Sequence, residues 1–158
     1  MYGQEENTRE QIIAEYQSDA AKLLRYLPWL SKKTGPDVST MYTGEGEMQL
    51  IPIPVYDSTL LAFVKEAEKT KFVDRYYPYV YSRNHIKTHE DEIRLLHNAK
   101  ITDMKIIIGI FSKYVLGGRT KASLWTEGVE SRVFFEVLDA LNRLLFTNTS
   151  DGKQMVRY

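Results

Sequence analysis

Three histidines are the first side chains of this sequence to consider for metal or acid–base chemistry: His85, His89 and His97. His89 and His97 stand eight positions apart, too far for one helical turn, and His85 precedes the helix expected to carry the other two. Carboxylates follow at Glu90 and Asp91, but acidic residues are favoured in the first turn of any helix. We therefore expect no metal site here.

Nucleophilic and carboxylate chemistry find equally little support. The chain has no cysteine, which excludes thiolate metal sites, disulfides and a cysteine nucleophile. Ser112 and Ser123 lack the Gly-x-Ser-x-Gly context of a nucleophile elbow. Ser112 falls inside an expected helix, where its side chain is expected to be packed or bonded to a preceding carbonyl. Glu45 and Glu47 belong to an expected turn, where charge is simply solvated. We predict no catalytic residue and no cofactor.

A glycine-rich segment at residues 117–121 has two interpretations. Two glycines followed by Arg119, Thr120 and Lys121 have the composition of a weak anion-binding nest. The alternative, which we favour, is a helix C-cap with one glycine in the left-handed conformation and with Arg119 and Lys121 bonding the last helical carbonyls. The negative end of a helix dipole at this point disfavours an anion.

The strongest candidate is the basic tyrosine segment, residues 69–89, where cations and aromatic rings alternate and only Asp74 is acidic before His89. Tyrosine and arginine are enriched at the energetic centres of protein interfaces, and both also stack on nucleic-acid bases. Tyr77 and either Val80 or Tyr81 are expected to be buried, because not all the rings of one short segment can face inward. The predicted partner-binding residues are Arg75, Tyr76, Tyr79, Arg83, His85 and Lys87.

Composition describes an ordinary globular chain. It has 158 residues, of which 43% are hydrophobic and 27% charged, with a formal net charge of zero. This size suits one domain, expected over residues 1–146, with a polar C-terminal tail at 147–158. The balanced charge disfavours a dedicated nucleic-acid binder. A polar N-terminus and the lack of long apolar runs predict a cytoplasmic protein that does not engage a membrane.

Apolar periodicity predicts a mainly α fold, a compact bundle of about five helices. Helices are expected from Thr8 to Leu27, from Ser58 to Lys69, behind a Thr88–Asp91 capping box, from Met104 to Leu116 and from Val129 to Leu145. In the second of these, Leu60, Leu61, Phe63, Val64 and Ala67 are expected to be buried. Residues 38–54 form either a small β-hairpin, with strands 38–42 and 48–53 around a turn at 43–47, or an extended segment.

Several short motifs give the chain a recognisable pattern. Leu-Leu-Arg-Tyr-Leu-Pro-Trp at 23–29 precedes Ile-Pro-Val-Tyr at 53–56, Leu-Ala-Phe-Val at 61–64 and Tyr-Val-Leu-Gly-Gly-Arg at 114–119. Gly-Val at 128–129 and a helix at 138–145 follow. Over about residues 23–146 the chain resembles a family of small bacterial proteins of unknown function found in genomes and mobile elements. The arginine–phenylalanine pair frequent in that family is replaced here by Thr120-Lys121-Ala122. The resemblance implies a bacterial or phage origin and carries no activity.

Together these patterns favour a non-enzymatic protein that binds a protein partner, or its own copy, through the basic tyrosine segment. With the resemblance, a phage or mobile-element inhibitor of a host defence factor is one concrete form of this function. The alternative is a nucleic-acid or nucleotide-binding module that uses the same surface, with Arg119 and Lys121 on phosphates. A hydrolase or transferase with an unfamiliar site is the third possibility.

Overall fold

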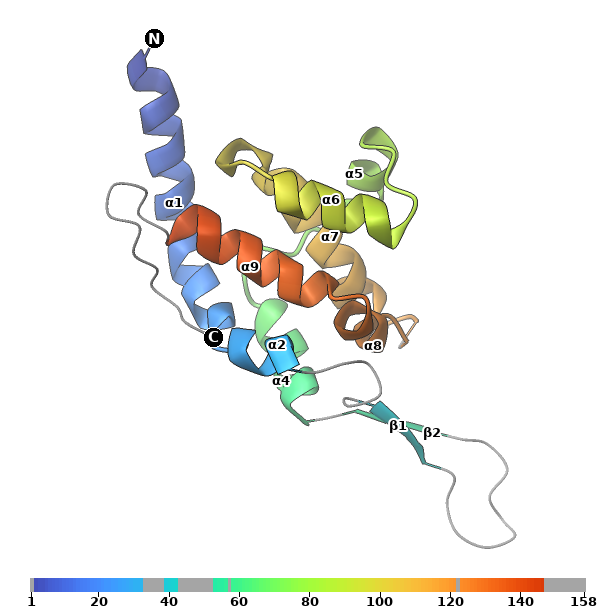
Figure 1. The fold of residues 1–158 in the computed structure, drawn as a ribbon. Coiled ribbons are helices and arrows are strands. Elements are labelled where there is room, and N and C mark those ends of the chain that lie inside the picture. Colours follow the sequence, from blue (N-terminus) through green and yellow to red (C-terminus); the bar gives the residue numbers. More distant parts are fainter. Residues whose placement is uncertain (1, 33–38, 43–52, 57, 122, 147–158) are drawn as a thin grey trace, which may run out of the picture.

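The computed structural model describes residues 2–32, 39–42, 53–56, 58–121 and 123–146, and within them the chain is mainly helical (Figure 1). The predicted tail at 147–158 and the predicted turn at 43–47 lie outside the described residues. The elements are α1 (Tyr2–Leu24), α2 (Leu27–Lys32), β1 (Ser39–Tyr42), β2 (Ile53–Tyr56), α4 (Ser58–Ala67), α5 (Tyr77–Arg83), α6 (His89–Asn98), the 3₁₀ turn η1 (Ile101–Asp103), α7 (Met104–Gly117), α8 (Ser123–Glu130) and α9 (Val133–Leu145).

The core is formed around α7 and α9. Both helices carry the apolar stripes read from the sequence, and α9 packs on α1, α2, α6 and α8 (Figure 1). Four aromatic rings meet at the centre in edge-to-face contacts, with centroids 5.2 to 6.0 Å apart: Phe63, Phe111, Tyr114 and Phe134. Such contacts add stability beyond the burial of area. Of the residues expected to be buried in α4, only Leu61 is exposed.

Two strands pair antiparallel at the end of the molecule beyond α4 (Figure 1). Ser39 aligns with Tyr56, and Tyr42 aligns with Ile53. The predicted second strand at 48–53 overlaps the observed β2 only at Ile53, and its other residues lie outside the described ones.

Two helix boundaries differ from the prediction at the N-terminal end. α1 begins at Tyr2, ahead of the expected start at Thr8. It also ends at Leu24, and a second helix, α2, contains Pro28 in its first turn. Proline is tolerated there because the first-turn N–H groups have no partner within the helix. Pro28 therefore does not end the helical region.

The predicted helix from Val129 to Leu145 is broken into α8 and α9. Arg132 adopts a left-handed conformation with φ of 69°, which a non-glycine residue rarely takes. Its guanidinium donates to the carbonyl oxygens of Leu30 and Ser31, at 3.3 and 3.4 Å, and lies 4.2 Å from the centroid of the Phe135 ring. These contacts at the C-terminal end of α2 offset the backbone strain.

No helix within the described ranges is long and apolar enough to cross a lipid bilayer.

Candidate functional site

The basic tyrosine segment forms the short helix α5 and the loops on either side of it. Tyr76 and Tyr79 are 63% and 64% exposed, so two large rings face solvent. The sequence predicts that Tyr77 and either Val80 or Tyr81 are buried, but all three are half-buried, and α5 contains no fully buried residue. The physical reason is that α5 lies at the edge of the bundle and packs mainly on α7 (Figure 1).

Close packing holds α5 against α7. Val80 sits over Gly109 so closely that a Cβ atom on this glycine would lie 2.5 Å from the Val80 Cγ1 atom. The Ser112 hydroxyl accepts from the Asp74 N–H at 2.8 Å and donates to the Phe72 carbonyl at 3.2 Å. Ser112 thus fixes the loop before α5. It is buried, as the first of its two expected arrangements requires, and its hydroxyl donates to Phe72 and not to a carbonyl of its own helix.

Both arginines of this surface are oriented by neighbouring tyrosines. Arg75 donates to the Tyr76 hydroxyl at 3.1 Å, and its guanidinium carbon lies 5.1 Å from the Tyr76 ring centroid. Arg83 donates to the Tyr79 hydroxyl at 3.0 Å. Within the described part of the chain, neither arginine lies within ion-pair distance of a carboxylate. Their positive charge is therefore held in place without being neutralised.

A hollow of about 700 Å³, here called the α5 groove, lies beside these side chains. Its apolar lining comes from Val73, Val80, Ile106 and Ile108. The described residues that line it also include Tyr16, Tyr76, Tyr79 and Asn84, three cations, Lys71, Arg83 and Lys105, and one carboxylate, Asp74. Asp74 accepts a hydrogen bond from the Tyr76 N–H at 2.9 Å. The groove thus combines an apolar floor with a cationic rim.

Of the six predicted partner-binding residues, Tyr76, Tyr79 and Arg83 line the α5 groove, and Arg75 stacks beside it on Tyr76. His85 and Lys87 lie beyond the C-terminal end of α5 and do not line it. His85 has a positive φ of 54°. The Lys87 N–H donates to Asp91 at the start of α6.

The sequence does not identify the groove residues contributed by other elements. Tyr16 comes from α1, while Lys105, Ile106 and Ile108 come from the first turns of α7. An exposed lysine next to isoleucines is ordinary in an amphipathic helix. No local signal therefore marks these residues as part of a site.

The glycine-rich segment at 117–121 is organised by an ion pair. Arg119 makes two hydrogen bonds to the Glu68 carboxylate, of 2.9 and 2.5 Å, and this contact raises the pKa of Arg119. The Thr120 hydroxyl donates to the Gly117 carbonyl at 3.2 Å. The anion-site candidates Arg119 and Thr120 are thus engaged within the protein, while the side chain of the third candidate, Lys121, makes no hydrogen bond or ion pair within the described part of the chain.

The predicted C-cap is wrong in one respect: neither Gly117 nor Gly118 is left-handed, and Gly118 has a right-handed φ of −64°. The N–H groups of Arg119 and Lys121 do donate to the last carbonyls of α7, those of Leu116 and Gly117, at 3.2 and 2.9 Å, while the Arg119 side chain pairs with Glu68. Glycine is needed at position 118 for space: an added Cβ would lie 2.1 Å from Nε1 of Trp125, whose indole N–H donates to the Val115 carbonyl.

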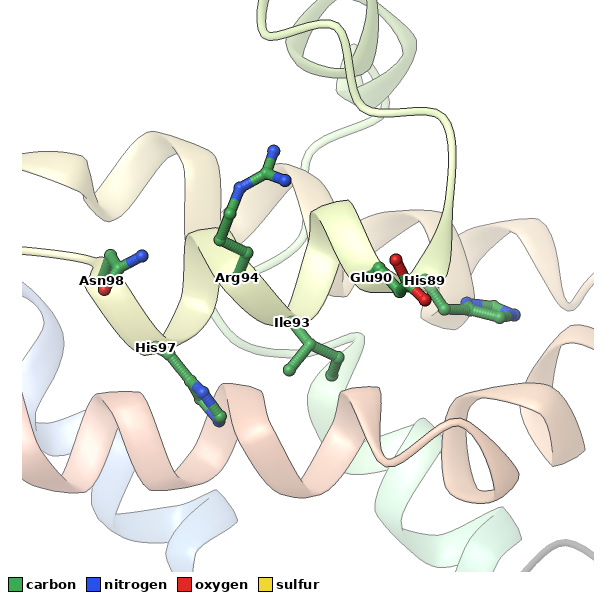
Figure 2. Close-up of a pocket in the computed structure, with 6 residues that line it drawn as sticks. All are labelled: His89, Glu90, Ile93, Arg94, His97 and Asn98. Atoms are coloured by element: carbon green, nitrogen blue, oxygen red, sulfur yellow. The ribbon is translucent and has the colours of Figure 1, made fainter.

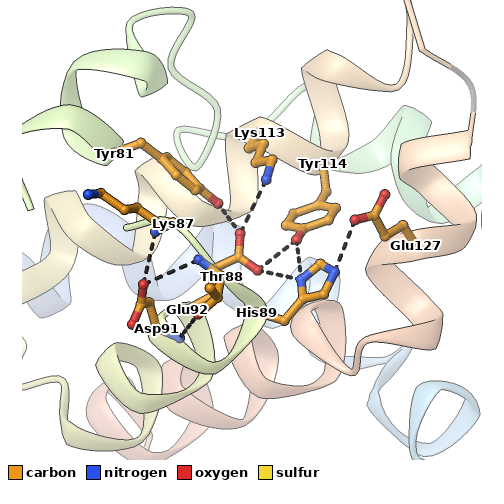
Figure 3. Close-up of polar contacts among 9 residues, drawn as sticks. All are labelled: Tyr81, Lys87, Thr88, His89, Asp91, Glu92, Lys113, Tyr114 and Glu127. Atoms are coloured by element: carbon orange, nitrogen blue, oxygen red, sulfur yellow. Dashed lines mark hydrogen bonds and ion pairs between the residues drawn. The ribbon is translucent and has the colours of Figure 1, made fainter. Parts of the chain in front are cut away.

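Behind α5 lies a group of buried and half-buried polar side chains that we call the Glu92 cluster (Figure 3). Glu92 is 1% exposed, and its carboxylate accepts hydrogen bonds from Tyr81 at 2.5 Å and Tyr114 at 2.7 Å. His89 Nδ1 lies 2.9 Å and Lys113 Nζ 3.6 Å from the same carboxylate. A buried carboxylate is tolerated only when several donors surround it, as here.

The cluster joins four helices. Burial, together with the neighbouring charge of Glu92, raises the pKa values of Tyr81 and Tyr114 far above the ordinary tyrosine value, so both remain hydrogen-bond donors. His89 Nε2 also lies 3.0 Å from the Glu127 carboxylate of α8. Tyr81 of α5 is therefore tied through Glu92 of α6 to Tyr114 of α7, and through His89 to α8 (Figure 3).

A second hollow, of about 490 Å³, runs along α6 (Figure 2). His89 and His97 lie near its opposite ends, with Ile93 and Arg94 between them. His97 Nε2 lies 2.7 Å from the Glu136 carboxylate of α9. Across the described ranges, no group of three or more His, Cys, Asp or Glu side chains is arranged to hold a metal ion. The two histidines instead connect α6 to α8 and α9.

Comparison of the chain with models of protein families, with curated proteins and with solved structures found no match.

Proposed function

We propose that this protein is a binding protein whose α5 groove takes an acidic segment of a protein partner. The observation that carries the proposal is the combination of two exposed tyrosines with a cationic rim that lacks ion pairs in the described part of the chain. Tyr76 and Tyr79 offer large, rigid contact areas that lose little conformational entropy on binding. Such rings often dominate the energy of an interface.

Charge complementarity indicates what the partner carries. Arg83, Lys71 and Lys105 line a hollow that contains one described carboxylate, in a protein whose net charge is zero. Elsewhere, Arg25, Arg94 and Arg119 are each paired with a glutamate or aspartate. Cations left without such a partner attract opposite charge and steer its approach. The apolar floor adds a place for a hydrophobic anchor within the acidic segment.

The resemblance suggests a setting for this function. A cytoplasmic inhibitor carried by a phage or mobile element would bind a host defence protein through the α5 groove. A second copy of the chain is an alternative protein partner. The exposed Tyr76 and Tyr79 rings beside guanidinium groups also favour, as a second candidate, a nucleic-acid strand with its bases stacked on them.

A charge-matched pair of variants tests the proposal. The probe is a fluorescent peptide of alternating glutamate and leucine, with oligothymidylate of equal charge as its competitor. We expect Arg83→Ala/Lys105→Ala to weaken peptide binding about 10-fold or more, equivalent to about 1.4 kcal/mol, at unchanged thermal stability. The control, Arg94→Ala/Lys100→Ala, removes the same charge from α6 and the loop after it and is expected to bind like the wild type.

Equal losses in both variants contradict the proposal, since they mean that only net charge matters. Tighter binding of oligothymidylate than of the peptide, with a steep dependence on salt, favours the nucleic-acid function instead.

A further inference from the structure

A second cationic hollow, here called the α4 hollow, lies between the C-terminal end of α1 and α4. It has a volume of about 350 Å³. Its described lining includes the cations Lys22, Arg25, Lys65 and Lys69, with Glu66 as the one carboxylate. The excess of positive charge seen in the α5 groove is thus repeated at a separate place on the surface.

Two of these four cations pair with carboxylates of the protein, and the other two have no ion pair within the part of the chain that the structure describes. Arg25 pairs with Glu66, which also accepts from the Tyr26 hydroxyl at 3.1 Å, and Lys22 lies 3.6 Å from Asp19. Lys65 and Lys69 have no ion pair within the described ranges. The α4 hollow therefore presents at least two charges for an external anion.

Consecutive residues of the 69–71 turn line the two hollows. Lys69 and Thr70 line the α4 hollow, and the next residue, Lys71, lines the α5 groove. The turn is held firmly: the Lys71 N–H donates to Asp19 of α1 at 2.9 Å, and the Thr70 hydroxyl donates to the Ala67 carbonyl at 2.7 Å. The separation of the hollows is consequently fixed by hydrogen bonds to α1 and α4.

The spacing of the two hollows follows from α1 and the turn after it. Tyr16 of α1 lines the α5 groove, and Tyr26, in the turn that follows α1, lines the α4 hollow. The eight residues from Tyr16 to the end of α1 at Leu24 rise about 12 Å, at about 1.5 Å each, and Tyr26 lies two residues farther along the chain. An extended peptide, which rises about 3.3 Å per residue, needs about five residues to cover that distance.

We propose, on the basis of the function proposed above, that the partner segment is an extended acidic polypeptide that occupies both hollows. It crosses the 69–71 turn and places acidic side chains near Lys65 and Lys69 at one end and near Arg83 and Lys105 at the other. With anchoring residues at both ends, the segment is about eight residues or longer. Neither hollow alone accounts for its full affinity, because linked contacts act at a high effective concentration.

Peptide length provides the test. Fluorescence anisotropy is measured with alternating glutamate–leucine peptides of about four and about twelve residues, only the longer of which spans the turn. We expect the long peptide to bind the wild-type protein about 10-fold or more tighter than the short one. Lys65→Ala/Lys69→Ala should abolish this advantage of length and leave binding of the short peptide unchanged. Arg94→Ala/Lys100→Ala should retain the advantage.

The possible outcomes separate this inference from the function on which it rests. If Arg83→Ala/Lys105→Ala weakens both peptides while Lys65→Ala/Lys69→Ala weakens neither, the single-groove function stands and the two-hollow inference is overturned. If Arg83→Ala/Lys105→Ala has no effect on either peptide, the proposed function itself fails. If oligothymidylate of equal charge binds more tightly than the long peptide, the assigned partner class is wrong.

Discussion

Replacing Glu92 by glutamine tests whether the Glu92 cluster holds the helices together. The substitution keeps the shape of the side chain and removes its charge. Two phenol hydroxyls, from Tyr81 and Tyr114, donate to this carboxylate. A hydrogen bond to a charged group contributes about 1.5–3 kcal/mol and a neutral one about 0.5–1.5 kcal/mol, so each phenol contact loses about 1 kcal/mol.

The charged neighbours do not greatly increase this loss. Lys113 and His89 have side chains that are 32% and 45% exposed, so water solvates both when the carboxylate is neutralised. Removing a buried charge also relieves its desolvation, which offsets part of the lost attraction. We expect Glu92→Gln to lower the free energy of unfolding by about 2 kcal/mol.

Urea unfolding followed by tryptophan fluorescence measures the effect in a double-mutant cycle with Tyr81→Phe. We expect a coupling energy of about 1 kcal/mol, because the two side chains share one hydrogen bond. Glu136→Gln is the control. It neutralises a carboxylate that pairs with the more exposed His97, and it should cost less than about 1 kcal/mol. The reasoning is refuted if Glu92→Gln and its control have equal effects and the coupling energy is zero.

Two further predictions concern the attachment of α5. Because burial and Glu92 raise the pKa values of Tyr81 and Tyr114, the folded protein keeps both phenol protons when the unfolded chain releases them. The free energy of unfolding should therefore be insensitive to these groups below about pH 10. Above that pH, each of the two tyrosines should lower it by about 1.4 kcal/mol per pH unit. Urea titrations of Tyr81→Phe should show a slope that is shallower by the contribution of one tyrosine, about 1.4 kcal/mol per pH unit. Gly109→Ala should lower the free energy of unfolding by about 1 kcal/mol, the middle of the range left when overpacking against Val80 costs about 1–3 kcal/mol and better helix propensity returns about 1 kcal/mol; a thermal stability above that of the wild type contradicts this.

Features of the fold that depend on neighbouring residues in the sequence could be predicted. The Thr88–Asp91 capping box at the start of α6 is confirmed: the Thr88 hydroxyl accepts from the Asp91 N–H at 3.1 Å, and the Asp91 carboxylate accepts from the Thr88 N–H at 3.2 Å. The apolar stripe of α9 is likewise buried along its length. Capping and amphipathic spacing are short-range effects, so the sequence displays them directly.

Features of the fold that depend on contacts between residues far apart in the sequence could not be predicted. The break at Arg132 relies on carbonyl groups of Leu30 and Ser31, about a hundred residues away, and the sequence has no glycine there to mark it. The sequence does not distinguish Glu92 from the other acidic residues in the first turn of α6. It is nevertheless buried, because Tyr81 and Tyr114 converge on it. In the candidate site, the tyrosines and arginines of the basic tyrosine segment stand out by type, whereas Tyr16 and Lys105 reach the groove only through tertiary packing.

The Glu92 cluster and the α5 groove are parts of one arrangement. A seven-residue helix is too short to be stable by itself in water, and α5 has no fully buried residue to anchor it. It is held instead by Val80 on Gly109, by Tyr81 on Glu92, and by the loop that Ser112 fixes. Inward attachment at positions 80 and 81 leaves Tyr79 to face solvent on the other side of the helix, and Tyr76, the residue before α5, is exposed as well. The buried carboxylate therefore helps to hold α5 in the position that leaves these two rings exposed, the surface proposed above to bind a partner.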